Sequence, residues 1–310
     1  MARRLLLIGG MTLPRPVIAG STAMSTRRCT QRQFWLRPSK KTNRILLYCL
    51  AVAAERTGLQ LHSFCCISNH EHNVATDPLG KRPEFHHLFH TFSAKCLNAH
   101  YGRWENLWSS EQTSVVNLVD AQAQIEKTLY TQSNPVSSHL VPHSTLWPGV
   151  ISRPEDVGKT IKIKRPKGFF AKDSKMPKVA KLKLTKLPAL AHLSDADYAK
   201  HLRQLIEAHE QELRQQMKAE GRLFFLGRKA ILEQDPWDSP TTFAPHRQMS
   251  PRLACKNKWA RIEAIQRIKE FVDGYALALT AFVAGDRNVV FPAGTYWMVR
   301  YVGARCAPAG

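Results

Sequence analysis

The sequence predicts an α+β fold, in which strand-like and helix-like segments follow one another in the order βαββαβ and a further helix follows the last strand. Two observations support this prediction. Short segments rich in β-branched, aromatic and small apolar residues are typical of buried strands, and two longer segments repeat apolar side chains at helical spacing. Their order is that of the split βαβ motif, and 310 residues leave room for one such domain and an accessory region.

The first half of the motif contains three of the strands and one helix. Residues 17–26 are expected to form the first strand. Residues 43–57 predict a helix, because apolar side chains recur there at helical spacing and Gly58 favours its C-terminal end. Residues 59–68 and 70–76 predict the second and third strands.

The second half of the motif adds a helix and the fourth strand. Residues 84–101 predict an amphipathic helix with phenylalanine and leucine side chains at helical spacing. Residues 113–119 predict the fourth strand. Asp120 comes directly after it and is a good N-cap for the next helix, because its carboxylate can accept hydrogen bonds from the first unpaired backbone N–H groups.

The motif His70-Glu71-His72 opens the third expected strand. Side chains alternate between the two faces of a strand, so His70 and His72 point to one side and Glu71 points to the other. Two imidazoles at this spacing can bind one divalent cation. Because the chain has 13 histidines, an ordinary surface pair is the alternative.

A second motif, residues 130–136, follows a helix-like segment. On a helix Tyr130 and Asn134 share a face, and Pro135 ends the helix because the residue before a proline is disfavoured in the α region. The helix end could therefore present a phenol oxygen and a third metal ligand to the paired histidines. A packed helix end without chemistry is the alternative.

These two motifs, together with residues 43–48, residues 102–106 and Trp147-Pro148, resemble the REP-associated tyrosine transposases, a group of the single-tyrosine HUH transposases. The resemblance covers approximately residues 17–150. It implies a ferredoxin-like domain with a four-stranded antiparallel sheet. The rest of the chain would then be a C-terminal extension like that of the longer members of this family.

The resemblance also implies a reaction. His70, His72 and Asn134 would bind Mg²⁺ or Mn²⁺, and Tyr130 would attack a phosphate of single-stranded or hairpin DNA. The 5′ end would stay on the tyrosine as a covalent phosphotyrosine, and a 3′ hydroxyl would be released. A phenol with an ordinary pKa near ~10 needs activation at neutral pH, which a bound cation can supply. We therefore expect a DNA transposase that cleaves and rejoins a strand.

Glu71 departs from the family pattern, in which a bulky hydrophobic residue faces the domain core. Asn73 on the same face is also polar, and a buried carboxylate without a partner is costly. Either this face is partly open or the active site is impaired. A catalytically impaired, domesticated descendant that binds DNA or RNA therefore stays open as an alternative. An HUH replication initiator or relaxase is a third alternative, which no feature of the sequence supports.

The charge of the chain favours a nucleic-acid partner. Lysine and arginine number 45 against 24 aspartate and glutamate, which gives a formal charge of +21. Such a charge predicts salt-dependent binding to phosphates, and a ribosome-associated protein or a generally basic surface is the alternative. Arg27, Arg28 and Arg32, which follow the first strand, are the candidate contacts to the DNA backbone, because arginine suits phosphate.

Four regions are expected along the chain. Residues 1–16 form an N-terminal extension, and residues 17–150 form the catalytic domain. Residues 151–194 form a basic linker or arm, and residues 195–310 form a mainly helical accessory domain. At 310 residues, one catalytic domain and one accessory domain are the expected number.

The basic region has a pattern of its own. Residues 159–186 contain eleven lysines and arginines and one acidic residue. The alternation at residues 161–164 and 181–184 predicts short strands or an extended arm, which either follows a DNA backbone or is a solvated loop. Further along, residues 195–221 and 259–282 predict two long helices.

Several other classes are disfavoured. No apolar run approaches the ~20 residues that cross a membrane, and the basic and apolar start is too short for a signal peptide. Seven cysteines without a Cys-x-x-Cys pattern argue against a disulfide framework or a zinc ribbon, so a reducing cytoplasm is the expected location. The sequence does not determine whether the protein forms a homodimer, and Met11 or Met24 is an alternative start.

Overall fold

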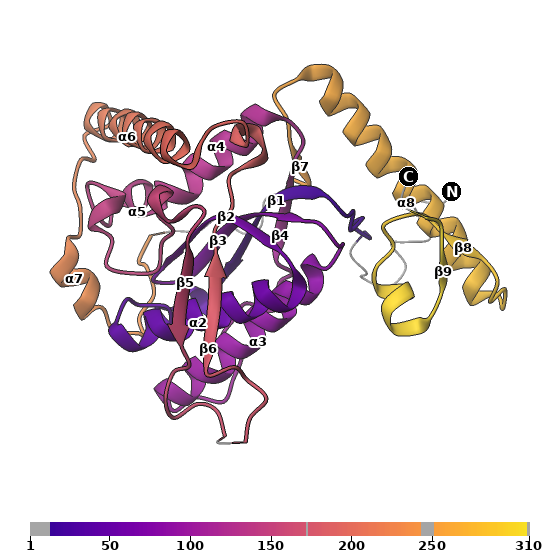
Figure 1. Ribbon diagram of the computed structural model, residues 1–310, viewed down its shortest axis with the longest axis horizontal. Helices are drawn as coiled ribbons and strands as arrows, with labels where there is room; N and C mark the ends of the chain where they lie inside the picture. Colours follow the sequence, from indigo (N-terminus) through magenta and orange to yellow (C-terminus); the bar gives the residue numbers. More distant parts are fainter. Residues whose placement is uncertain (1–12, 172, 243–250, 309–310) are drawn as a thin grey trace.

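Five strands form one sheet in the computed structural model, which describes residues 13–171, 173–242 and 251–308. Their order across the sheet is β2-β3-β1-β4-β7. The first four strands pair in antiparallel fashion, whereas β7 is parallel to β4. The α+β fold and the four expected strands are thus confirmed, in the order of a split βαβ motif (Figure 1). The strands are β1 (Ser21–Arg28), β2 (Gln60–Ile67), β3 (His70–Asp77), β4 (Ser114–Leu118) and β7 (Leu253–Ala254).

The sequence does not predict the fifth strand. The N–H group of Asn117 in β4 donates to the carbonyl oxygen of Arg252, and the N–H group of Val119, just after β4, donates to that of Ala254. Both N···O distances are 3.0 Å. A strand as short as β7 has no periodicity that could reveal it. Its pairing partner, which is distant in the sequence, is what defines it.

Strand β1 differs from the prediction at both ends. It begins at Ser21 rather than at residue 17, because the chain turns at Gly20, whose φ is +78°. It continues to Arg28, which pairs with His70 of β3. The first strand therefore runs the full length of β3 and reaches the histidine motif.

Three helices cover the two faces of the sheet (Figure 1). Helices α2 (Lys40–Thr57) and α3 (Arg82–Tyr101) pack against each other on one face, and α4 (Ala121–Gln132) lies on the other. Helix α2 begins before the predicted residue 43, because Ser39 accepts a hydrogen bond from the N–H of Thr42.

The helix that carries Tyr130 begins as predicted and ends differently. Asp120 caps α4, since its carboxylate accepts a hydrogen bond of 2.8 Å from the N–H of Ala123. The helix ends at Gln132, and a short helix, α5 (Asn134–Ser137), follows at once. Pro135 lies in the first turn of α5, where its missing N–H costs no helical hydrogen bond. The proline therefore begins a second helix rather than simply ending the first.

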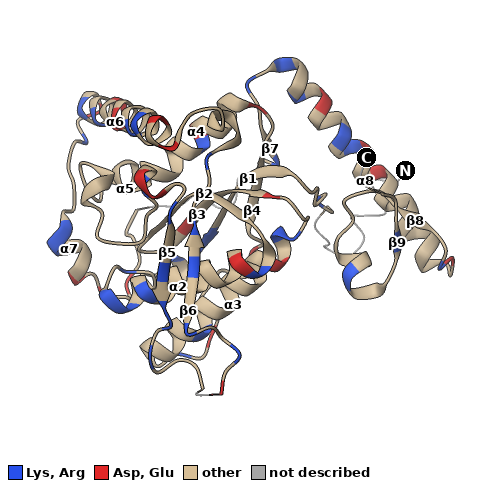
Figure 2. Cartoon of the chain, viewed as in Figure 1, with Lys and Arg blue, Asp and Glu red and all other residues tan. Residues whose placement is uncertain are grey.

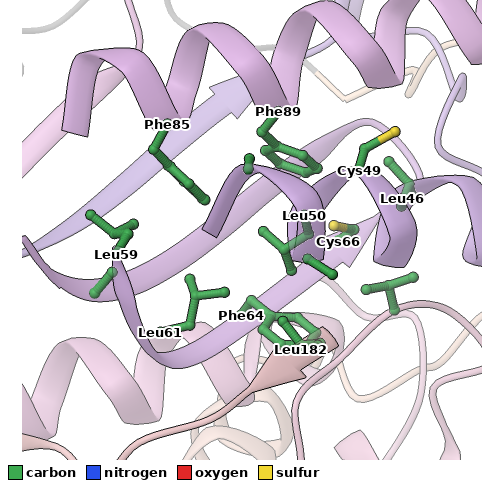
Figure 3. Packing of buried hydrophobic residues seen from close by; sticks show 14 of the residues in the cluster. Leu46, Cys49, Leu50, Leu59, Leu61, Phe64, Cys66, Phe85, Phe89 and Leu182 are labelled. Atoms are coloured by element: carbon green, nitrogen blue, oxygen red, sulfur yellow. The ribbon is translucent and has the colours of Figure 1, made fainter. Parts of the chain in front are cut away.

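The main hydrophobic core lies between the sheet and helices α2 and α3 (Figure 3). Phe85 and Phe89 of α3 belong to it, together with Leu50 of α2 and Phe64 of β2. A smaller cluster on the other face of β2 contains Cys65 and its neighbours. Both faces of the central strands are thus buried, which restricts the side chains that the sheet can accept there.

Strands β5 (Thr160–Lys164) and β6 (Val179–Lys183) form an antiparallel ribbon, which confirms the strands expected at residues 161–164 and 181–184. Ile163 and Leu182 are buried in the main core and pack against α2. The segment expected to be a linker therefore shares the core of the preceding region. The domain boundaries themselves stay a prediction.

The C-terminal region is mainly helical, as expected. Figure 1 shows a long helix, α8, that projects from the main body toward the part that holds β8 and β9. Those two strands are parallel, and the end of α8 packs with them around a separate small hydrophobic cluster. Besides β7, the region contains α6 (Asp195–Ala219), α7 (Arg228–Glu233), α8 (Lys258–Val283), β8 (Val290–Phe291), a π-helical segment (Met298–Val302) and β9 (Arg305–Cys306).

Some expectations for the chain ends concern residues outside the described part. The predictions for residues 1–12, among them the alternative start at Met11, fall there, whereas residues 13–16 of the expected extension are described. Within residues 13–171, 173–242 and 251–308, no helix combines the length and the apolar composition needed to span a membrane.

We predict that Leu182→Ala destabilises the protein by about 2–5 kcal/mol, the usual cost of removing a buried leucine side chain, because Leu182 is 0% exposed. The matched control is Lys181→Ala, which alters the neighbouring exposed position and should change the free energy of unfolding by less than about 0.5 kcal/mol. Urea denaturation measures both variants. Equal, small effects would mean that the ribbon is not part of the core.

Candidate active site

Strand β3 begins with two histidines on the sheet face that α4 covers. The ring centroids of His70 and His72 lie 4.7 Å apart, and the ring planes are nearly perpendicular at 89°. The ring of Tyr130, from α4, lies edge-on to His72 at a centroid distance of 5.3 Å. The two imidazoles and the phenol, which belong to distant motifs in the sequence, therefore meet in one site.

Each histidine is oriented by an oxygen atom near its Nδ1. The Oγ1 of Thr26 lies 2.7 Å from Nδ1 of His72, and the Oδ1 of Asn69 lies 2.8 Å from Nδ1 of His70. An amide oxygen only accepts, so Nδ1 of His70 donates to it and the lone pair of this ring is on Nε2. The buried Nε2 of His72 has no hydrogen-bond partner among the described residues.

Asn134 lies at the start of α5, just beyond the helix that carries Tyr130. Its side chain is buried, and its Oδ1 also has no hydrogen-bond partner in the described part of the chain. A buried acceptor without a partner costs about 1–3 kcal/mol. Two such atoms, Oδ1 of Asn134 and Nε2 of His72, are the nitrogen and oxygen donors that a divalent cation would satisfy.

The described residues contain no cluster made only of the most common metal ligands. No group of three histidine, cysteine, aspartate or glutamate side chains is arranged there to hold a metal ion. The candidate site has two histidines, and its third donor is the amide of Asn134. A cation would therefore be held by a neutral ligand set.

Both imidazoles favour the neutral form. Burial, together with the charge of Arg28, lowers the pKa of His70 to about 4. Burial, followed by the charges of His70 and Lys127, holds the pKa of His72 well below its usual range. The neutral imidazole is the form that binds metal ions.

Tyr130 is 41% exposed, so a substrate can reach its side chain. Partial burial of the side chain raises the pKa of its phenol. The ammonium group of Lys127 lies 5.5 Å from the centroid of the phenol ring. At neutral pH the phenol therefore keeps its proton, and it becomes a strong nucleophile only when this proton is removed.

Glu71 points to the opposite face of β3, toward α3, and is 1% exposed. The Nδ2 of Asn73 donates to its Oε2 over 2.9 Å, and Nε2 of His90 lies 3.2 Å from its Oε1. The Nη1 of Arg27 lies 3.2 Å from Nδ1 of His90. Because a guanidinium only donates, His90 carries its proton on Nε2 and donates to Glu71.

This network explains how the polar side chain of Glu71 is accommodated at a position where the family pattern has a hydrophobic residue. The face is closed, and the carboxyl group of Glu71 has partners inside the protein. Burial raises the pKa of Glu71 to about 8, whereas the hydrogen bond from Asn73 and the charge of Arg27 lower it. Glu71 therefore belongs to the packing between β3 and α3, on the face that is turned away from His70 and His72.

The three candidate DNA-binding arginines have different surroundings. Arg27 is turned into the protein, where its Nη2 donates to the carbonyl of Ser109 over 3.0 Å. Arg28 is exposed and pairs with His70 across β1 and β3. Arg32 has a left-handed φ of +61°, and its guanidinium donates to the carbonyl and hydroxyl oxygens of Thr242. Their contacts with DNA stay a prediction.

Two residues of the site were not singled out from the sequence. Thr26 lies opposite His72 in the β1–β3 pair, and no local pattern could assign it to this histidine. Asn69 directly precedes the motif, so its position next to His70 was a usable signal. A C-terminal segment also lies nearby, because the Oγ of Ser68 donates to Oε1 of Gln234 over 2.7 Å.

Asp120 links the start of the tyrosine helix to the C-terminal region. Its Oδ1 accepts from Ala123, and its Oδ2 accepts from the N–H groups of Lys256 and Asn257 over 2.6 and 2.8 Å. Burial alone would raise the pKa of Asp120, but the hydrogen bonds that it accepts, the largest from Asn257, lower it to about 2. The ionised carboxylate therefore stabilises the folded state.

The chain is similar to several solved structures, among them two transposases. No family model matches the sequence, and no curated protein matches it. The chain is similar to a REP-associated tyrosine transposase solved in complex with a REP hairpin, with 16% identity and a TM-score of 0.39 over 53% of this chain and 90% of that chain. It is also similar to a candidate transposase from Deinococcus radiodurans R1, with 18% identity and a TM-score of 0.28 over 38% of this chain and 94% of that chain.

We predict that Asp120→Asn removes a pH-dependent part of the stability. A carboxylate with a folded pKa of about 2 and an unfolded pKa near ~3.9 stabilises the protein fully above the unfolded pKa and loses this effect as the pH falls toward 2. The wild type should therefore lose more stability than Asp120→Asn between pH 5 and pH 3, as measured by urea denaturation. The exposed Asp173→Asn serves as a control, and parallel curves for all three proteins would contradict the prediction.

Proposed function

We propose that the protein is a DNA transposase that cleaves and rejoins single-stranded DNA through a 5′-phosphotyrosine on Tyr130. One observation carries this proposal: the phenol of Tyr130 lies against His72, while Nε2 of His72 and Oδ1 of Asn134 are buried without a hydrogen-bond partner among the described residues. A nucleophile and cation ligands are thus close enough to act on one phosphate. The resemblance of the motifs to the REP-associated tyrosine transposases supports the same reaction.

The proposed cleavage exchanges one phosphoester bond for another. The phenol oxygen of Tyr130 forms a bond with the phosphorus atom, and the bond from phosphorus to the 3′ oxygen breaks. The phenol proton is lost, and the released 3′ oxygen takes up a proton. In rejoining, a 3′ hydroxyl attacks the phosphotyrosine and Tyr130 recovers its proton. Because each bond that breaks is replaced by a similar one, no nucleotide cofactor is required.

A divalent cation is part of the proposal. Mg²⁺ or Mn²⁺, bound by His70, His72 and Asn134, would polarise the phosphate and stabilise the charge of the transition state. The site is preorganised for the cation, since Thr26 and Asn69 orient the imidazoles of His72 and His70. Burial keeps both rings neutral, so no proton has to leave them before they bind the ion.

Single-stranded or hairpin DNA is the proposed substrate. The formal charge of +21 favours a phosphate-rich partner, and Figure 2 shows lysine and arginine on many elements of the main body. Arg28 is exposed beside His70, where a guanidinium could bind the phosphate next to the one that is cleaved. A homodimer and a cytoplasmic location stay predictions.

The alternative of an impaired, non-cleaving descendant rests on Glu71. The hydrogen bonds of Glu71 with Asn73 and His90 account for a buried carboxyl group at this position without any loss of the site on the other face. No specific observation therefore favours the alternative. It remains a distinguishable outcome of the experiments below.

We predict that Tyr130→Phe abolishes the covalent adduct and leaves the affinity for hairpin DNA within about twofold of the wild type, a change below ~0.5 kcal/mol. Phenylalanine keeps the ring that packs against His72 and lacks the nucleophilic oxygen. The measurement is a denaturing gel with labelled hairpin-forming DNA from the flanks of the gene, with Mn²⁺ or with EDTA.

The outcomes of this test are distinct. An adduct in the wild type that needs Mn²⁺ and disappears in Tyr130→Phe supports both the reaction and its nucleophile. An adduct that persists in the mutant would contradict the assignment of Tyr130. Tight binding by the wild type without an adduct on any substrate would instead favour the non-cleaving descendant.

We predict that His72→Ala weakens Mn²⁺ binding by at least about tenfold, because it removes a donor whose orientation Thr26 provides. Electron paramagnetic resonance of free Mn²⁺ measures this binding directly, without DNA or cleavage. The exposed His192→Ala is the matched control and should bind Mn²⁺ like the wild type. Unchanged binding in His72→Ala, or full cleavage in EDTA, would exclude this metal site.

A further inference from the structure

We infer that the ribbon of β5 and β6 is a second DNA-binding surface, which holds the double-stranded stem of a hairpin through its exposed lysines. This inference rests on the proposed function in its choice of DNA as the partner. It assigns a role to the basic region that follows the candidate catalytic part, and it separates the binding of the stem from the cleavage of an unpaired strand.

The ribbon has one face of lysines. Lys162 and Lys164 of β5 and Lys181 and Lys183 of β6 are all exposed. Lys162 is directly paired with Lys181 in the antiparallel register. Because alternate residues of a strand share a face, the four ammonium groups lie on the same side of the ribbon. Figure 2 shows the lysines on both strands.

This arrangement is not explained by the stability of the chain. Like charges that face each other across two strands are destabilising. No carboxylate of the described residues forms an ion pair with any of the four lysines. Asp173 is the one acidic residue between residues 159 and 186. An anionic partner would relieve the repulsion that the protein itself leaves in place.

The other face of the ribbon fixes the lysines in position. Ile163, Ala180 and Leu182 are buried in the main core, and Figure 3 shows Leu182 and Phe64 of β2 among the residues of this cluster. The hydroxyl of Tyr48 in α2 also donates to the carbonyl of Pro177, just before β6, over 2.6 Å. The backbone beneath the lysines is therefore ordered before any ligand binds, which lowers the entropic cost of binding.

The spacing of the lysines suits a phosphate backbone. Alternate residues advance by about 6.6–6.8 Å along a strand, and two nucleotides advance by about 6.8 Å along the axis of duplex DNA. The exposed positions of the ribbon are lysines together with Thr160 and Val179, without an aromatic side chain. Surfaces for single strands stack bases on aromatic rings, so we infer a duplex stem that is bound without base readout.

The ribbon is separated from the candidate active site. Leu184, directly after β6, forms a β-bridge with Leu61 near the start of β2, whereas His70 pairs with Ile67 at the other end of that strand. The distance along β2 is about 20 Å, or roughly six base pairs of DNA. A stem on the ribbon would therefore leave its unpaired flank free to reach Tyr130.

The test compares two fourfold variants of the full-length protein with the same net charge. One is Lys162→Gln, Lys164→Gln, Lys181→Gln and Lys183→Gln. The control changes four exposed lysines on α3, α6 and α8, namely Lys95→Gln, Lys200→Gln, Lys218→Gln and Lys269→Gln. Fluorescence anisotropy measures the affinity of each protein for a hairpin with a stem of about one helical turn, over a series of salt concentrations. Thermal unfolding checks that both variants are folded.

The slope of log K, where K is the association constant, against log salt concentration is negative. We expect its magnitude to be smaller by about 3–4 in the ribbon variant than in the wild type, since each neutralised phosphate contributes about 0.9. The control variant should change this slope by less than about 1. Equal slopes in the two variants would overturn the inference. So would an equal loss of affinity for a single-stranded oligonucleotide, or a loss of binding to anionic phospholipid vesicles with hairpin binding unchanged.

Adduct formation on short single-stranded DNA separates this inference from the proposed function. We expect the ribbon variant to form the Tyr130 adduct as the wild type does. An adduct together with an unchanged slope would overturn the ribbon surface and leave the proposed function standing. A reduced slope with no adduct in any of the proteins would overturn the transposase reaction and support the ribbon as a duplex-binding surface.

Discussion

The burial of strand β3 on both faces is the constraint on which the rest of the structure depends. Side chains alternate along a strand, so His70 and His72 of β3 point toward α4, whereas Glu71 points toward α3. Each face then needs its own polar partners, because unpaired polar groups are costly inside a protein. Glu71 is hydrogen-bonded to Asn73 and His90, whereas on the other face Nε2 of His72 has no hydrogen-bond partner within the part of the chain that the structure describes.

The two faces of β3 have different roles, one in packing and the other in the candidate active site. On the α3 face the acceptors of Glu71 are satisfied by the protein, so this network contributes to packing. On the α4 face, hydrogen bonds at Nδ1 orient the rings of His70 and His72 and leave donor atoms for a cation. A polar residue in the core of a family-like motif is therefore compatible with an intact site, provided that its own face of the strand supplies the partners.

The C-terminal half contributes to the surroundings of this site. Asp120 joins the start of α4 to the backbone of Lys256 and Asn257, and Gln234 reaches Ser68 beside the histidine motif. The ribbon of β5 and β6 shares the core with α2. The C-terminal half is thus packed onto the sheet at several positions, and its β5–β6 ribbon presents lysines to the solvent beyond the candidate active site.

The sequence by itself determined the four antiparallel strands and the helices α2, α3, α4, α6 and α8, and it singled out His70, His72, Tyr130 and Asn134 as candidate site residues. These features have local causes, namely side-chain periodicity, caps such as Asp120, and the spacing of residues along one element. The tertiary structure alone decided that β7 joins the sheet, that Thr26 orients His72, and that His90 and Arg27 surround Glu71. These contacts join segments that are distant in the sequence, and packing selects them because each buried polar group must find a partner wherever the fold supplies one.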